Sequence, residues 1–198
     1  MAADVALALP PAPKPVRPRV LLVGTSLAAA ASFMAIIGLV GFYLSARAGV
    51  LAAGTPWLPD GVTIPLTPGN MSMATMLISG VTMWWAVDAV GKNDRQMAYL
   101  ALGLTIFFGI AVINATTFLY SQMHLPVATT QGVMIYTITG LHVAMMVAGL
   151  LYAGVMTFRT LGGEYQGRDR EGLTAAALYW YVTIAAYAVI WLAIYVTK

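Results

Sequence analysis

Hydrophobic residues in this chain fall into five long runs, separated by short segments rich in polar residues, glycine or proline. Each run holds about 20 or more mainly apolar residues, which is the length that an α-helix needs to cross the hydrocarbon of a bilayer. The pattern therefore predicts an all-α integral membrane bundle of five transmembrane helices. The predicted spans are approximately residues 20–45, 71–90, 97–120, 131–158 and 173–196.

Residues 1–19 follow a different pattern. Five prolines and three basic residues crowd this stretch, and prolines at that density prevent a helix. The apolar run that follows is too long for a signal peptide and lacks a convincing cleavage site, so we interpret it as the first span. We predict a Pro-rich basic cytoplasmic tail over 1–19 and a single membrane domain over 20–198.

The basic residues give an orientation. Cytoplasmic loops of membrane proteins carry an excess of lysine and arginine. Two basic residues, Arg47 and Lys198, fall on one side of the predicted bundle. The other eight fall on the opposite side: Lys14, Arg17, Arg19, Lys92, Arg95, Arg159, Arg168 and Arg170. We therefore expect the N-terminus in the cytoplasm and the C-terminus outside.

Composition agrees with a membrane protein. Hydrophobic residues make up 60% of the chain and charged residues only 9%, whereas soluble domains carry about 25% charged residues. The net charge of +3 arises from basic residues in short loops, so it does not indicate a nucleic-acid partner. The chain has no cysteine, which excludes disulfides and thiolate metal sites.

Histidine is the residue type that could make a redox centre here, and there are two. His142 lies roughly 16 Å into the fourth span at 1.5 Å per residue, whereas His124 lies in the turn before that span. The two cannot share a haem iron, and with no mid-membrane carboxylate they cannot make a copper or di-iron site. We expect no redox centre in this chain.

A histidine at that depth is costly unless it has a partner. We expect a neutral His142 imidazole bonded to a nearby hydroxyl or carbonyl, for example that of Thr139 one turn earlier. The alternative is contact with a lipid headgroup or a partner subunit.

Other polar side chains have simpler interpretations. Asp88 and Lys92 are four residues apart on one helix face, close to the interface, and predict a surface ion pair. Asn114, Thr116 and Thr117 lie in the later half of the third span, where we expect them to bond across to neighbouring helices.

The aromatic residues predict membrane anchoring and packing. Trp57, in the longest loop between spans, is expected at the headgroup level. Trp180, Tyr187 and Trp191 share one helical face; rings near the ends of this helix would anchor it, and Tyr187 at mid-depth would pack on another helix. The charged segment 168–171 is interpreted as a solvated surface.

Three short motifs occur in order along the chain. The first span contains Ser-Phe-Met-Ala-Ile at 32–36 and is followed by Ser-Ala-Arg-Ala at 45–48. Residues 137–143 read Thr-Ile-Thr-Gly-Leu-His-Val. Residues 179–184 read Tyr-Trp-Tyr-Val-Thr-Ile. Together with the span count and orientation, these segments resemble subunit III of the haem–copper terminal oxidases, the cytochrome c oxidase subunit III family. The match is to the short five-span form of many bacterial oxidases.

The departures from the family pattern concern its ionisable residues. The family's intramembrane glutamate falls at Ser32, the first histidine of its pair at Thr139, and its last-helix histidine and aspartate at Tyr181 and Ile184. Family residues at such positions hold phospholipid headgroups and assist proton delivery. The resemblance therefore implies a retained scaffold role without those ionisable groups. The candidate lipid or partner contacts that it implies are His142, Ser32, Asn114, Trp180 and Tyr181.

The resemblance implies a non-catalytic structural subunit of a respiratory oxidase that reduces oxygen to water. It would have no active site of its own, and would stabilise catalytic subunit I, contact other oxidase subunits and bind phospholipids in a cleft, in a bacterial inner membrane. Haem and copper would belong to the catalytic subunit. Two alternatives are an accessory protein of a nitric oxide reductase and a small multi-pass transporter using His142 or Asp88.

Overall fold

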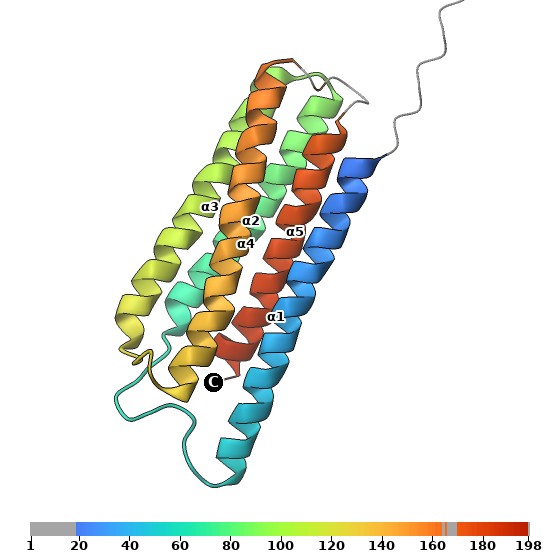
Figure 1. Ribbon diagram of the computed structural model, residues 1–198. Helices are drawn as coiled ribbons and strands as arrows, with labels where there is room; N and C mark the ends of the chain where they lie inside the picture. Colours follow the sequence, from blue (N-terminus) through green and yellow to red (C-terminus); the bar gives the residue numbers. More distant parts are fainter. Residues whose placement is uncertain (1–18, 164, 166–169, 198) are drawn as a thin grey trace, which may run out of the picture.

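The computed structural model describes residues 19–163, 165 and 170–197. These residues form five long helices and contain no strand, as the apolar pattern predicts (Figure 1). Most of the predicted tail, residues 1–18, lies outside the described residues. The helices are α1 (Val20–Ala52), α2 (Leu66–Gly91), α3 (Arg95–Met123), α4 (Thr130–Leu161) and α5 (Glu171–Ile190), which continues as a π-helical turn, η1 (Trp191–Val196).

Most helices extend beyond the predicted spans; α1 continues to Ala52, whereas the pattern predicts an end at about residue 45. Hydropathy marks where a helix crosses hydrocarbon, but capping groups decide where it ends. The Asp94 side chain accepts a hydrogen bond from the Met97 N–H at the start of α3. The Thr129 hydroxyl accepts one from the Gly132 N–H at the start of α4. These caps lie outside the apolar runs, so hydropathy does not locate them.

Helix α5 lies at the centre of the arrangement. It packs against α1, α2 and α4, while α3 packs mainly on α2 and also contacts α4. Helix α1 lies on the outside of the bundle, against α5 and α4 (Figure 1). We call the end of the bundle where α1 and α5 begin the basic end. We call the opposite end, which carries loop 53–65, the loop end.

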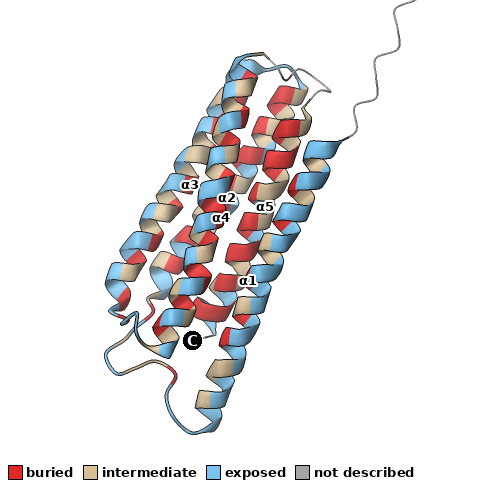
Figure 2. Cartoon of the chain, in the orientation of Figure 1, coloured by how far each residue is buried: buried red, intermediate tan, exposed pale blue. Residues whose placement is uncertain are grey.

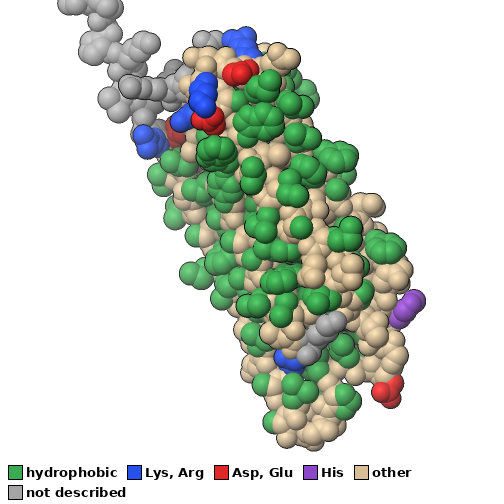
Figure 3. Space-filling model, turned by 180° about the vertical axis from the view of Figure 1, so that it is seen from behind, with side chains coloured by type: hydrophobic (Ala, Val, Ile, Leu, Met, Phe, Trp, Pro, Cys, Tyr) green, Lys and Arg blue, Asp and Glu red, His purple; other side chains and the backbone are tan. Residues whose placement is uncertain are grey.

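Burial follows this arrangement. Buried residues face the inside of the bundle and exposed residues cover its outside (Figure 2). Many exposed residues are large and apolar; Leu151 is 68% exposed and Phe42 65%. Seen from behind, hydrophobic side chains extend along the bundle and most charged side chains gather at one end (Figure 3). Such a surface suits hydrocarbon, and five helices are long and apolar enough to cross a membrane.

Candidate functional site

Three buried residues with polar groups lie along one face of α5. Trp180, Thr183 and Tyr187 are spaced three and four residues apart, which places them on one side of a helix. All three are buried. Because buried polar groups are costly without partners, the hydrogen bonds of this face show what the sequence-predicted site residues do.

Trp180 fills the middle of the bundle. It is 0% exposed, and its indole Nε1 donates to the Ser79 hydroxyl of α2 over 3.0 Å. Gly149 of α4 leaves room for the ring, because a Cβ there would lie 2.9 Å from Trp180 Cε3. The prediction that end rings of this helix anchor it at the membrane surface is therefore wrong for Trp180, which joins α2, α4 and α5.

His142 bridges α4 and α5. Its Nε2 lies 3.2 Å from the Thr183 carbonyl oxygen, and the residue is 2% exposed. A carbonyl oxygen only accepts, so Nε2 carries the hydrogen and donates it. The predicted bond to a hydroxyl or carbonyl exists, but Thr139 is the wrong partner. The Thr139 hydroxyl instead bonds the Ile135 carbonyl and the Tyr120 hydroxyl.

Tyr187 continues this face toward the loop end. Its hydroxyl donates to the Gly69 carbonyl of α2 over 3.2 Å. Its ring centroid lies 5.1 Å from that of His142. Tyr187 therefore packs on other helices, as its mid-depth position predicts.

The remaining predicted contacts do not join this cluster. Ser32 is half-buried on α1 and its hydroxyl donates to its own helix, at the Ala28 carbonyl. Asn114 is exposed on α3. Tyr181, 39% exposed, lies on the outside of α5. The structure therefore brings His142 and Trp180 to one buried face and leaves the other three residues at the surface.

The prediction that Thr116 and Thr117 of the third span bond across to neighbouring helices is wrong. Thr116 and Thr117 donate to carbonyls of their own helix, at Val112 and Ile113. Hydroxyls commonly make this bond to the previous turn. A sequence does not show whether a hydroxyl turns to its own helix or to another.

Trp57 packs against the protein. It is 5% exposed, and its Nε1 donates to the Tyr43 hydroxyl of α1 over 3.2 Å. The two rings meet edge to face at 5.5 Å. Trp57 therefore fastens loop 53–65 to α1.

At the basic end, the predicted pair is confirmed: Lys92 Nζ lies 2.7 Å from Asp88 Oδ2. Segment 168–171, interpreted as a solvated surface, has two described residues, and both are half-buried and bonded to other helices. Arg170 donates to the Val87 carbonyl of α2, and Glu171 accepts from the Leu22 N–H in the first turn of α1. Residues 168 and 169 lie outside the described residues.

These contacts hold helices together. In the described part of the chain, no three histidine, cysteine, aspartate or glutamate residues lie close enough to bind a metal ion. The apolar exterior, the five long helices and this hydrogen-bonded core define a multi-pass helical membrane protein.

Comparison with known proteins gives the family. The model of the family "Cytochrome c oxidase subunit III" matches residues 19–198, and the chain belongs to this family. Similar proteins named cytochrome c oxidase subunit 3 occur in Cyprinus carpio, with 29% identity, and Xenopus laevis, with 30%, each over 160 residues. These alignments cover 79% of this chain and 59% of each relative. A third, from Paracentrotus lividus, is 30% identical over 78% of this chain and 59% of its own length.

Proposed function

We propose that the chain is the non-catalytic subunit III of a respiratory haem–copper terminal oxidase. The match to the subunit III family across residues 19–198 carries this proposal. In it, the chain lies in a bacterial inner membrane, stabilises catalytic subunit I, contacts other oxidase subunits and binds phospholipids. Haem and copper, and the reduction of oxygen to water, belong to the catalytic subunit.

The polar core supports a scaffold role. The proposed role needs a stable surface for a partner and no reacting group, and the bonds of Trp180, His142 and Tyr187 each join α5 to another helix. An ion-coupled transporter, by contrast, normally keeps a titratable group in mid-membrane that can change its charge. His142 is buried and bonded to a main-chain carbonyl, and Asp88 is paired with Lys92 near a helix end. Both groups fit structural roles better.

Co-purification tests the proposal. The full chain, tagged and extracted in mild detergent, should bring a haem-bearing catalytic chain with it, and the preparation should consume oxygen. Visible spectra and metal analysis should show haem together with copper. A partner with haem and non-haem iron would instead assign the chain to a nitric oxide reductase. Isolation of the chain alone, with no haem-bearing partner, would contradict both assignments.

A further inference from the structure

An open groove lies between α2 and α5 on the outside of the bundle. Its volume is about 610 Å³, within the range of about 300–1,000 Å³ typical of small-ligand sites. Its walls are uncharged and mostly apolar, and include Met73, Leu77 and Trp84 of α2 and Tyr181, Ala185 and Ala188 of α5. The groove is therefore suited to a hydrocarbon chain.

A glycine of α2 faces α5 in the wall of the groove. A Cβ at Gly80 would lie 2.9 Å from Cδ1 of Ile184 on α5. Gly80 and Ile184 both line the groove. The groove is therefore framed by a close helix contact.

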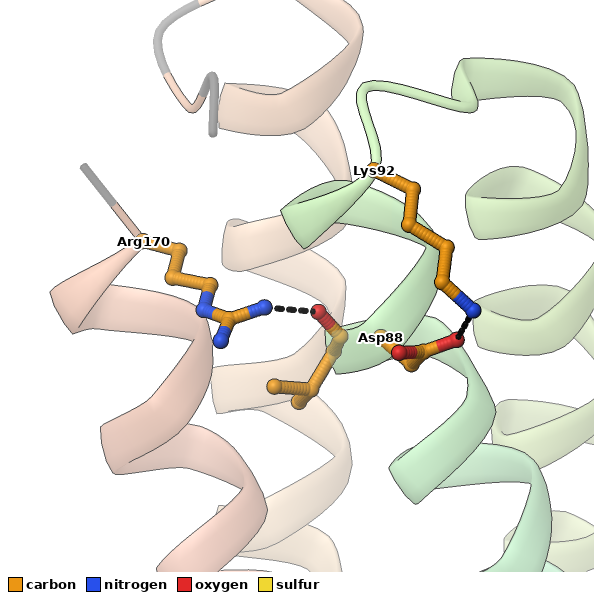
Figure 4. Close-up of polar contacts among 4 residues, drawn as sticks. Asp88, Lys92 and Arg170 are labelled. Atoms are coloured by element: carbon orange, nitrogen blue, oxygen red, sulfur yellow. Dashed lines mark hydrogen bonds and ion pairs between the residues drawn. The ribbon is translucent and has the colours of Figure 1, made fainter. Parts of the chain in front are cut away.

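An arginine lies just beyond the groove toward the basic end. Arg170, directly before α5, extends to α2, where its Nη1 donates to the Val87 carbonyl over 2.9 Å (Figure 4). Val87 follows Trp84 of the groove wall by about one helical turn. Gly91 leaves room for this side chain, since a Cβ there would collide with Arg170 Nη1. The structure thus places the Arg170 guanidinium between α2 and α5, at the end of the groove that is nearer the basic end.

The Arg170 guanidinium and the nearby Lys92 ammonium group differ in whether they are paired with a carboxylate. Lys92 is paired with Asp88 over 2.7 Å (Figure 4). The Glu171 carboxylate accepts from the Leu22 N–H. Arg170 forms no ion pair within the described ranges, and its bond to Val87 occupies one of the five N–H donors of a guanidinium.

We propose that the α2–α5 groove binds an anionic phospholipid, with an acyl chain along the groove and the phosphate on Arg170. A guanidinium presents N–H groups that match two phosphate oxygens at once. Charge complementarity at one end and an apolar channel at the other fit one amphiphile of this kind. This inference deepens the lipid-binding part of the proposed function, but it depends on the α2–α5 geometry and not on which complex holds the chain.

Native mass spectrometry tests the headgroup. The full chain is purified with the chains that accompany it, in mild detergent containing equal amounts of dioleoyl phosphatidylglycerol and dioleoyl phosphatidylcholine. Both lipids carry a phosphate, but in phosphatidylcholine the choline cation offsets its charge. The released chain should therefore retain the anionic lipid in about two- to fivefold preference, the range of a solvent-exposed ion pair. Arg170→Gln should reduce the preference to near unity. Lys92→Gln, which removes a neighbouring cation already paired with Asp88, should keep it.

A second pair of variants tests the groove. Ala185→Phe places a ring in the groove and should reduce retention of both lipids by half or more. Ala35→Phe adds the same ring to an exposed position of α1 and should leave retention unchanged. Val81→Trp, from the α2 wall, should repeat the effect of Ala185→Phe and guards against a folding defect in either variant.

Three results would overturn the inference. The preference could survive in Arg170→Gln, or fall equally in Lys92→Gln, which would indicate diffuse surface charge. Alternatively, the wild-type chain could retain no lipid while Val81→Cys cross-links to an accompanying chain, which would show that a partner helix fills the groove. Haem spectra of the same samples separate the two proposals. A haem partner without lipid preference overturns the lipid site alone, and lipid preference without a haem partner overturns the oxidase assignment alone.

Discussion

His142 is the histidine that lies inside the bundle, and its surroundings give it a packing role. It donates to the carbonyl of Thr183, which lies inside α5 and so also accepts the helical bond from four residues further on. Removal of the imidazole therefore leaves no orphaned acceptor. The volume of the side chain between α4 and α5 matters more than its chemistry.

Two substitutions of His142 separate volume from chemistry. His142→Leu loses one interhelical hydrogen bond, worth about 0.6 kcal/mol on average in membranes, and keeps most of the packing. His142→Ala also leaves a cavity, which should raise the cost to about 2 kcal/mol or more. Unfolding in mixed micelles of increasing denaturing detergent measures both. Equal damage from the two variants would contradict a packing role.

The Tyr43–Trp57 pair makes a second prediction at this scale. Tyr43→Phe removes the acceptor of the buried Trp57 N–H, and an unsatisfied buried donor costs about 1–3 kcal/mol. Trp57→Phe in the same background removes that donor. The double variant should therefore cost less than the sum of the single variants, by the same unfolding measurement. Additive costs would show that the bond does not contribute.

At the scale of elements, small residues set how closely α4 and α5 approach. Gly149 faces the rigid rings of Trp180 and Tyr179, whereas a Cβ added at Gly154 on the same helix would have no neighbouring atom within 4 Å. Both lie inside α4, so their helix propensities are alike. Their different surroundings provide a matched comparison.

Alanine at these two positions should have opposite effects. Gly149→Ala forces a methyl group against the Trp180 indole and should destabilise the bundle by about 1–3 kcal/mol. Gly154→Ala meets open space and should be neutral or stabilise the helix by up to about 1 kcal/mol. Detergent-induced unfolding followed by far-UV circular dichroism measures the difference. A similar loss in both variants would mean that the contact with Trp180 is not what requires glycine.

At the scale of the whole molecule, the distribution of charge predicts how the bundle lies in a membrane. In the sequence, eight of the ten basic residues fall before the first span, between the second and third spans or between the fourth and fifth spans. Because these segments adjoin the helix termini at the basic end, we expect this end in the cytoplasm. The chain has no cysteine, so any introduced thiol is the only one. Gln96 lies at the basic end and Asp60 in loop 53–65, and both are exposed.

Cysteine labelling tests this orientation. A membrane-impermeant maleimide should label Asp60→Cys in intact cells, and Gln96→Cys only after the cells are broken. The cysteine-free wild-type chain provides the background. The reverse labelling would place the basic end outside and contradict the positive-inside prediction.

The sequence by itself determined the fold class and much of the family resemblance. Five apolar runs of sufficient length leave few options in a bilayer, because every main-chain polar group must find a partner within its own segment. The Asp88–Lys92 pair was also predictable, since it depends on four-residue spacing along one helix. Properties that depend on local spacing or on length can be obtained without a tertiary structure.

Only the tertiary structure decided which helices lie side by side, and therefore which partner each polar group has. Thr183 lies 41 positions from His142, Ser79 lies 101 from Trp180, and Val87 lies 83 from Arg170. Hydropathy is almost the same around each of these helices, so the sequence pattern does not show which side faces lipid and which faces protein. For the same reason, Trp180 looked like a surface anchor in the sequence and is buried in the bundle. The packing of α5 against α1, α2 and α4 settles these contacts, because each bond requires two helices to meet at one depth.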